Sequence, residues 1–214
     1  GNFADIVESL RGYAAFGTLF TAKPRFGQFA VFRNDLIDEQ KRQTLPLIIY
    51  PVPSARTKGV VMWSNLAGAT VVGPTAEEHD SRSVAVNKQS SANFLLQTAN
   101  ARLKDGVVPA KDVFFYWGIR PATTVDDYVI RQSGRDWVVA ASIRSTGFSS
   151  CLAVAKRVAS LLGVQGASDS DPKWTVVPSE FQGIRLNPSE NFIELKGKRF
   201  VVTHPQSRIL FAKL

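Results

Sequence analysis

Residues 142–147 read Ser-Ile-Arg-Ser-Thr-Gly and separate two apolar patterns of different period. Before them, residues 137–141 (Trp-Val-Val-Ala-Ala) are apolar and rich in strand-forming side chains, which predicts a short strand. After them, five apolar residues recur at helical spacing: Phe148, Leu152, Ala155, Ala159 and Leu162. The region therefore predicts a strand, a tight turn and a helix over 147–162 that ends at Gly163.

Arg144 stands in this turn, directly before the start of the predicted helix. Ser145 and Thr146 provide hydroxyl caps, and Gly147 lets a ligand approach the backbone. The first N–H groups of a helix lack intrahelical partners and carry partial positive charge, so they favour an anion or an electron-rich carbonyl oxygen. The alternative is an ordinary capped helix that binds nothing.

Arg120 occupies a similar frame, Trp-Gly-Ile-Arg-Pro at residues 117–121. The proline restricts the residue before it to extended backbone, which places Arg120 at the end of a strand. A guanidinium there can bind a carboxylate or a phosphate through two parallel hydrogen bonds. The alternative is a structural ion pair with Asp126 or Asp127. Arg120 and Arg144 are thus candidates for one anion-binding site.

The amino-acid composition limits the classes of protein to which the chain can belong. The 214 residues are 44% hydrophobic, and no run of about 18 apolar residues is present to cross a bilayer, so we expect a soluble, folded chain. The net charge is +8, but Lys and Arg are scattered, which indicates solvated surface charge and no specific nucleic-acid site. The single cysteine, Cys151, excludes an internal disulfide. His79 and His204 lack ligand spacing, so we expect no metal site.

The first half of the chain predicts a helix followed by strands. Residues 2–11 form a short amphipathic pattern with Asn2 as its N-cap. Its apolar face combines four residues: Phe3, Ile6, Val7 and Leu10. A chain that opens on a helix has, we expect, lost the strand that led into it. Four β-rich runs follow and predict an antiparallel meander with a charged loop over 34–42: 26–32, 47–51, 59–63 and 69–73.

The second half predicts a further helix, further strands and a separate tail. The helix covers 86–104, where four apolar residues share one face: Ala92, Leu96, Ala99 and Leu103. Strands are expected at 112–119 and 127–132. After a polar linker at 167–172, the tail carries three β-like runs: 192–195, 200–203 and 209–211.

Five short motifs occur in a fixed order: Gly-Asn-Phe-Ala-Asp at 1–5, Pro-Arg-Phe-Gly-Gln-Phe at 24–29, Val-Gly-Pro-Thr at 72–75, Gly-Ile-Arg-Pro at 118–121 with Asp-Asp-Tyr-Val-Ile at 126–130, and Ile-Arg-Ser-Thr-Gly-Phe at 143–148. Together they resemble the C-terminal half of FAD-dependent oxidoreductases of the D-amino-acid oxidase superfamily, and most closely the FAD-dependent glycerol-3-phosphate dehydrogenases. No Gly-x-Gly-x-x-Gly occurs among the 15 glycines, so the nucleotide-binding unit of such an enzyme is expected to precede Gly1.

The resemblance implies an α+β fold, with an antiparallel or mixed β-sheet substrate-binding domain, flanking helices and pieces of an incomplete FAD-binding α/β domain. By analogy, residues 1–13 are a remnant of the FAD-binding domain and residues 14–134 are the substrate-binding domain. Residues 135–166 are the last strand and helix of the FAD-binding domain. Residues 167–214 form a β-rich C-terminal extension that the resemblance does not cover.

The resemblance also implies roles for individual residues. Arg120 matches an arginine that faces the substrate above the flavin, and Arg144 falls where the glycerol-phosphate enzymes carry a basic residue. Ser145, Thr146 and Gly147 would lie against the flavin. The implied reaction oxidises a small anionic alcohol, glycerol 3-phosphate to dihydroxyacetone phosphate, with FAD as cofactor and a quinone or another electron acceptor. No catalytic base is assigned.

Most of the implied cofactor site lies outside this sequence, so the lone chain is predicted to be inactive and not to hold FAD. Two alternatives stay open. One is an FAD-dependent 2-hydroxyacid oxidoreductase acting on a 2-hydroxyglutarate-like substrate. The other is a non-catalytic basic binding or assembly module on the same scaffold, with the tail from Lys196 to Leu214 as its binding region. An oligomer is compatible with the sequence, and the expected location is mitochondrial in a eukaryote and otherwise cytoplasmic or membrane-associated.

Overall fold

The structure, a computed structural model, describes residues 1–10, 19–33, 47–54, 57–65, 69–83, 85–103, 113–164, 192–195, 197–202 and 204. The predicted loop at 34–42, the linker at 167–172 and the strand at 209–211 lie outside these ranges. Within them, no helix is both long and apolar enough to span a bilayer. Helices and antiparallel strands occur together, which confirms the predicted α+β class.

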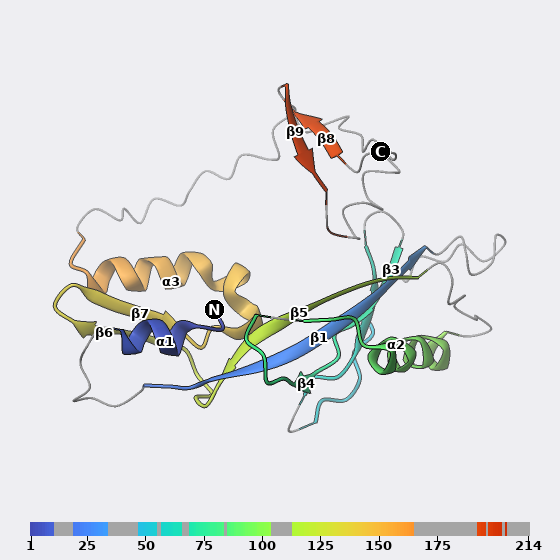
Figure 1. Ribbon diagram of the computed structural model, residues 1–214, viewed down its shortest axis with the longest axis horizontal. Coiled ribbons are helices and arrows are strands. Elements are labelled where there is room, and N and C mark those ends of the chain that lie inside the picture. The colour runs from blue at the N-terminus through green and yellow to red at the C-terminus, as the bar shows by residue number, and fades with distance from the viewer. Residues whose placement is uncertain are drawn as a thin grey trace. The chain divides into compact units, whose positions relative to one another are not determined.

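The chain divides into two compact units. The first unit contains the described residues of Gly1–Phe26, Glu77–Ala85 and Gly118–Pro172, and the second contains those of Gly27–Ala76, Val86–Trp117 and Lys173–Leu214. Two long strands, β1 (Ala22–Arg33) and β5 (Val113–Thr123), pair with each other, and each has residues in both units (Figure 1). The assignment of residues 1–13 and 135–166 to an FAD-binding domain, and of 14–134 to a substrate-binding domain, stays a prediction.

The main sheet is antiparallel, but its strand order is not that of a meander. β2 (Val61–Ser64) pairs with β3 (Ala69–Gly73), and β3 pairs in turn with β1. The order is β2-β3-β1-β4, where β4 is Glu77–Glu78. In the predicted meander the strand at 26–32 would neighbour the strand at 47–51; this part of the prediction is wrong, because β1 instead pairs with β3, all of whose residues are buried. The strand predicted at 47–51 is reduced to one bridge between Ile49 and Met62.

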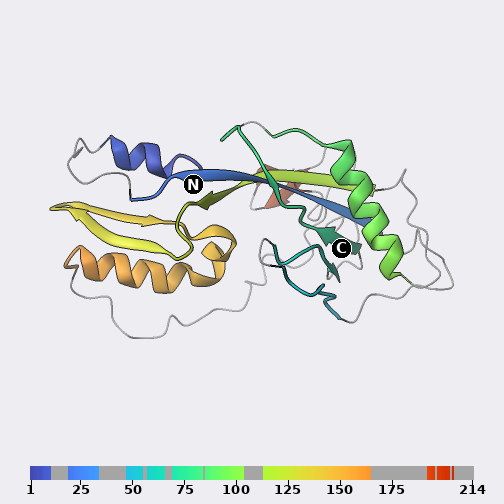
Figure 2. The same cartoon turned by 90° about the horizontal axis from the view of Figure 1, so that it is seen from below.

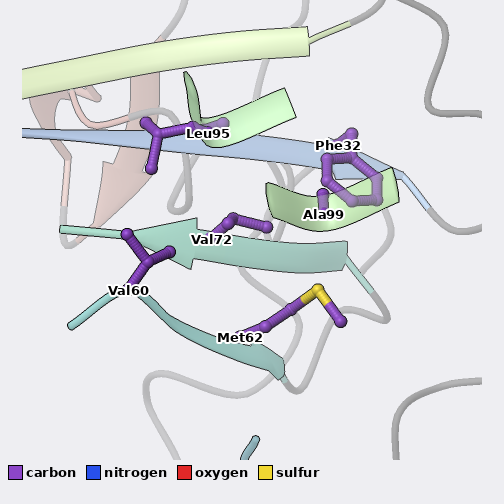
Figure 3. Close-up of a cluster of buried hydrophobic side chains, with 7 residues drawn as sticks. Phe32, Val60, Met62, Val72, Leu95 and Ala99 are labelled. Carbon is purple, nitrogen blue, oxygen red and sulfur yellow. The ribbon is translucent and has the colours of Figure 1, made fainter. Parts of the chain in front are cut away.

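The second unit has a closed apolar core between this sheet and α2 (Gln89–Arg102) (Figure 3). Seven buried side chains form it: Ala30, Phe32, Val60, Met62, Val72, Leu95 and Ala99. The predicted face of the helix is correct for Ala92 and Ala99, which are buried. Leu95, which that face omitted, has no exposed surface, whereas Leu96 and Leu103 only border the core.

Gly73 closes β3 at a point where a side chain cannot fit. Its φ is 146°, and a Cβ atom would lie 2.5 Å from Cδ1 of Phe29. The following peptide bond, Gly73-Pro74, is cis. Beyond it, the hydroxyl of Thr75 accepts a hydrogen bond from the Gln28 N–H at 3.0 Å, and the Thr75 N–H donates to the Gln28 carbonyl at 3.0 Å. The glycine is thus required by the packing of the second unit itself.

The first unit contains a two-stranded hairpin, β6 (Val129–Gly134) and β7 (Trp137–Ala141). The hairpin lies between two helices, α1 (Ala4–Ser9) and α3 (Gly147–Leu161) (Figures 1 and 2). A 3₁₀ turn, Arg144–Thr146, leads into α3. The predicted strand, turn and helix over 137–162 are confirmed. One cluster of buried apolar residues beside the hairpin contains Phe20, Val139 and Ala141.

Helix α1 buries its acidic side. Its buried residues are Asp5 and Glu8, whereas the four residues of the predicted apolar face are exposed. Asn2 is not the N-cap, a position held by Phe3, and its side-chain amide donates to the Ile119 carbonyl at 3.0 Å. The apolar face predicted from the sequence is thus present, and it is the exposed side of the helix.

Polar contacts explain why α1 turns its acidic side inward. Arg82 donates to both carboxylate oxygens of Asp5, at 2.6 and 3.0 Å. The hydrogen bond and charge of Arg82, with N–H groups of Ala22 and Ile6 donating to the same carboxylate, lower the pKa of Asp5 to about 2. Glu8 accepts hydrogen bonds from the side chains of Ser133 at 2.5 Å and Trp137 at 2.9 Å. Both acids are therefore satisfied, as buried charges must be.

The tail contains one described hairpin, β8 (Phe192–Leu195) and β9 (Lys198–Val201). β8 matches its predicted limits, and β9 begins two residues before the predicted 200–203. The Arg199 guanidinium lies 3.8 Å above the Phe192 ring, a cation–π contact across the hairpin.

Candidate functional site

Arg120 lies on β5 in the first unit and is half-buried. Burial, and then the positive charge of Arg25 on the neighbouring strand β1, lower the pKa of Arg120 from its ordinary value. The fold thus brings two guanidinium groups close enough to repel each other. Two like charges in a partly buried place favour an anion that binds between or beside them.

The turn before α3 has an unusual backbone. Ser142 and Arg144 both have positive φ, 60° and 56°, which side chains other than glycine rarely adopt. Side-chain contacts hold this shape. The buried Ser142 hydroxyl lies 2.6 Å from the hydroxyl of Thr123 and donates to the Val125 carbonyl at 3.1 Å. Non-glycine residues in this region of φ concentrate at functional sites, where the surrounding structure holds them.

The Arg144 side chain points toward the residues that follow β5. Its Nη2 atom donates to Asp126 Oδ1 at 2.8 Å and to the Val125 carbonyl at 3.1 Å. The Arg144 side chain is 42% exposed and that of Asp126 is fully exposed, so the pair is weak and can exchange for another anion. The ion pair with Asp126 that the sequence offered to Arg120 is therefore made by Arg144.

A group of hydroxyls lies at the start of α3. Thr146 donates to the Ile143 carbonyl at 2.9 Å and also bonds the phenol oxygen of Tyr128. The same phenol bonds the Ser150 hydroxyl at 3.4 Å. Hydrogen bonds from Ser150 and then Thr146 lower the pKa of the exposed Tyr128 phenol. The predicted capping role of Thr146 is not seen, because no side-chain cap bond forms at this helix end.

Gly147 and Gly118 are glycines that the described fold does not require. A Cβ atom on Gly147 would meet only Ile143, at an ordinary 3.6 Å, and its φ of −56° suits any residue. At Gly118 a Cβ atom would meet nothing within 4 Å. Glycine without a structural cause often marks a close approach of a ligand to the backbone. The local packing therefore leaves the backbone at Gly147 open to a neighbouring group.

The structure does not assign a catalytic base. The His79 ring lies 5.8 Å from the Phe26 ring, and the His204 ring lies 4.4 Å from that of Tyr116 in the second unit. Sequence reasoning did not single out Arg25, whose charge acts on Arg120, or Tyr128, which bonds Thr146. Both stand in quoted motifs, but their nearness to Arg120 and to Thr146 depends on strand pairing that no single segment reveals.

Comparison with known proteins gives one family and several relatives. The family model described as FAD dependent oxidoreductase matches residues 7–161. A glycerol 3-phosphate dehydrogenase of Caloramator mitchellensis is 25% identical over 186 residues, which cover 83% of this chain and 37% of that protein. A glycerol 3-phosphate oxidase of Mycoplasma genitalium is 27% identical over 153 residues, 68% of this chain and 38% of that protein.

A solved structure shows the same fold. Dithionite-reduced L-α-glycerophosphate oxidase from Mycoplasma pneumoniae, with FAD bound, is similar over 76% of this chain and 41% of its own, with a TM-score of 0.60 and 23% identity. The chain therefore spans only 37% to 41% of the length of these relatives.

Proposed function

Because the chain belongs to the FAD dependent oxidoreductase family, we propose that it is the substrate-side part of an enzyme that oxidises a small anionic alcohol. The match over residues 7–161 confirms the resemblance seen in the sequence motifs. The first candidate for the substrate is glycerol 3-phosphate, with dihydroxyacetone phosphate as product. The names of the two curated relatives support this choice.

The observation that carries the proposal is the proximity of Arg25 and Arg120 in the first unit. Burial, and then the positive charge of Arg25, lower the pKa of Arg120. A phosphate dianion relieves the repulsion and accepts bidentate hydrogen bonds from a guanidinium. We assign Arg120, with Arg25, to binding the anionic end of the substrate.

Arg144 is the second substrate cation in this proposal. Its exposed ion pair with Asp126 is weak enough to be replaced by a substrate phosphate. The positive φ of Arg144 is held by the contacts of Ser142 and of the Val125 carbonyl. The chain thus keeps this guanidinium beside the start of α3 before any ligand arrives.

We assign the cofactor side of the site to Ser145, Thr146 and Gly147. Gly147, which the local packing does not require, leaves the backbone accessible at the start of α3. The N–H groups there suit an electron-rich edge of a flavin. FAD supplies the acceptor for the hydride that leaves the substrate carbon. The residues of this chain bind and orient the substrate, and most of the cofactor contacts lie on other parts of the enzyme. The lone chain is therefore proposed to be inactive.

A covalent chimera tests this function. In it, the 214-residue chain replaces the matching region of the Caloramator mitchellensis dehydrogenase, and flavin absorption reports anaerobic reduction. We expect reduction by glycerol 3-phosphate but not by glycerol. Arg120→Ala should raise the substrate concentration for half-maximal reduction about 100-fold, because a buried charge partner is lost. Arg120→Lys should recover part of this, and Arg135→Ala, in the exposed β6–β7 turn, should have no effect.

Two other results would each replace the proposal. Reduction by 2-hydroxyglutarate and not by glycerol 3-phosphate would favour the 2-hydroxyacid oxidoreductase. A flavin-loaded chimera that neither substrate reduces would contradict an oxidoreductase of this substrate class. The basic binding module would then gain support from a gel shift with strong salt dependence, although Arg199 in the tail is already in contact with Phe192.

A further inference from the structure

The Asn2 side chain is bonded to the residue directly before Arg120. Its Nδ2 atom donates a hydrogen bond to the Ile119 carbonyl at 3.0 Å, although the two residues are 117 positions apart in the sequence. On the other side of Arg120, the ring of Pro121 fixes its own φ and restricts Arg120 to extended backbone. The backbone is therefore held on both sides of the guanidinium that we assign to the substrate.

Arg82 fixes Asn2 in turn. Its Nη1 atom donates to the Asn2 carbonyl at 2.7 Å and also to Asp5 Oδ1 at 2.6 Å. Its Nη2 atom donates to Asp5 Oδ2 at 3.0 Å. A guanidinium can make all three bonds because its donors lie in one rigid plane. Since two carboxylate oxygens hold that plane, the direction in which Arg82 presents Nη1 to Asn2 is fixed as well.

Asp5 extends these contacts to the strand that carries Arg25. Its Oδ2 atom also accepts a hydrogen bond from the Ala22 N–H at 2.8 Å. Ala22 is the first residue of β1 and precedes Arg25 by three positions. Three residues of the first unit thus form one network, which we call the Asn2 network: Asn2, Arg82 and Asp5. It bonds the start of β1 at one end and the β5 carbonyl before Arg120 at the other.

The Asn2 side chain adds little to the stability of the fold. Its Oδ1 atom is buried, and within the described part of the chain it accepts no hydrogen bond. A buried acceptor without a donor costs at least as much free energy as an ordinary hydrogen bond contributes. The bond from Nδ2 to the Ile119 carbonyl is therefore offset within the same side chain. The effect of this amide is on where the end of β5 lies.

Two neighbouring cations need such a restraint. Burial, and then the positive charge of Arg25, lower the pKa of Arg120, so the two guanidinium groups act on each other. If the strand ends could move, repulsion would separate the two groups, and an anion would have to bring them together at a cost in affinity. A network that bonds both strands removes this cost before the ligand arrives.

We propose that Asn2 is a positioning residue: through the Ile119 carbonyl, it holds Arg120 where this arginine and Arg25 bind an anion together. Arg82 and Asp5 support Asn2 and tie it to the start of β1. This inference rests on the proposed function for the identity of the substrate. The alternative is a network that only anchors α1 to the first unit and has no effect on anion binding.

The probe is inorganic phosphate, added to the full 214-residue chain at constant ionic strength. The chemical shift of the backbone N–H at position 120 in ¹H–¹⁵N spectra reports binding. We expect Asn2→Ala to weaken phosphate binding about tenfold and Arg120→Ala to weaken it about 100-fold. The control is Asn93→Ala, which removes an exposed asparagine of α2 that accepts a hydrogen bond from Gln89. It should leave the phosphate affinity unchanged.

A double-mutant cycle separates positioning from a purely structural role. If Asn2 acts through Arg120, Asn2→Ala in the Arg120→Ala background should weaken phosphate binding by less than about twofold. Arg82→Lys preserves the charge beside Asp5 but lacks the planar set of donors, so it should weaken phosphate binding about threefold or more. The urea midpoint of Asn2→Ala should stay close to that of the original chain, because the lost bond and the removed acceptor offset each other.

Four results would each overturn the inference. They are an original chain that binds no phosphate at this site, an Asn2→Ala variant with unchanged phosphate affinity, equal losses from Asn2→Ala with and without Arg120, and an Asn2→Ala variant that unfolds. The last two would identify Asn2 as a structural residue. If Asn2→Ala unfolded while Arg82→Lys folded and bound phosphate like the original chain, the whole network would be structural.

The flavin-loaded chimera tests the proposed function separately. In it, Asn2→Ala should raise the glycerol 3-phosphate concentration for half-maximal reduction about tenfold, with the limiting rate of reduction changed by less than about twofold. Phosphate binding that depends on Asn2, in a chimera that glycerol 3-phosphate does not reduce, would contradict the proposed function alone.

Discussion

The two units place their apolar side chains in opposite ways. In the second unit, Phe32, Met62 and Leu95 have no exposed surface. In the first unit, Phe148 is 95% exposed while the carboxylates of Asp5 and Glu8 are buried. The second unit contains both sides of its core within the described chain. The first unit has large apolar side chains at its surface, and polar contacts hold the acidic side of its helix α1.

A substitution of an apolar residue is therefore expected to have different effects in the two units. An apolar residue in the second unit contributes to folding, because its burial is complete within this chain. An exposed apolar residue in the first unit contributes little to folding of the lone chain. Buried polar residues of the first unit are expected to stabilise its fold, as buried apolar residues stabilise that of the second unit.

The largest effect is expected from Leu95→Ala. This change removes a fully buried side chain from the second unit's core and should lower the free energy of unfolding by about 3 to 5 kcal/mol. Phe148→Ala, a larger truncation, should change it by less than about 0.5 kcal/mol because that ring is exposed. Urea denaturation of the full chain, followed by circular dichroism, measures both. Equal losses would show that α3 is covered within the chain.

Gly73 and Gly147 should respond in opposite ways to substitution by alanine. Gly73→Ala places a Cβ atom 2.5 Å from the Phe29 ring at a φ of 146°, so it should destabilise the chain by about 2 kcal/mol or more. Gly147→Ala meets no close atom and should be neutral or stabilising by up to about 1 kcal/mol, since alanine favours helix. In the flavin-loaded chimera the order should reverse, with Gly147→Ala weakening FAD binding. Unchanged FAD affinity for Gly147→Ala would remove this turn from the cofactor site.

The buried acid of α1 makes the first unit sensitive to low pH. The pKa of Asp5 is about 2 in the folded chain against an ordinary 3.8. A lowered folded pKa means that the stabilisation is complete above about pH 4 and is lost as the pH falls toward 2. The amount is about 2 kcal/mol. Asp5→Asn should abolish both the stabilisation and this pH dependence, as measured by hydrogen exchange of α1.

The matched control for this change is Asp136→Asn in the exposed turn of the hairpin, which should keep the acid dependence of the parent chain. If Asp5→Asn retained the same loss of α1 protection between pH 4 and pH 2, another group would be responsible, and the polar anchoring of the first unit would need a different account.

The sequence predicted the structural features that depend on local residue patterns. It missed those that depend on pairing between distant segments. The strand, turn and helix over 137–161 follow from a change of apolar period and were predicted almost to the residue. The amphipathic pattern of α1 was also correct, but a local pattern does not reveal which face of a helix the fold buries. The pairing of β3 with β1 and the nearness of Arg25 to Arg120 arise from contacts between distant segments, which no local window contains.

The smallest effect on stability is expected from Asp126→Asn, because the Arg144–Asp126 pair is exposed. Such pairs contribute about 0 to 1 kcal/mol, so the free energy of unfolding should change by less than about 0.5 kcal/mol, unlike that of Asp5→Asn. The substrate concentration needed to reduce the chimera should distinguish two roles of the Arg144–Asp126 pair. If Asp126 competes with substrate for Arg144, the substitution lowers the glycerol 3-phosphate concentration needed to reduce the chimera. If Asp126 instead positions the guanidinium for substrate, that concentration rises, and Arg144→Lys should raise it further, because a lysine ammonium lacks the other guanidinium nitrogens that remain to bind the substrate phosphate.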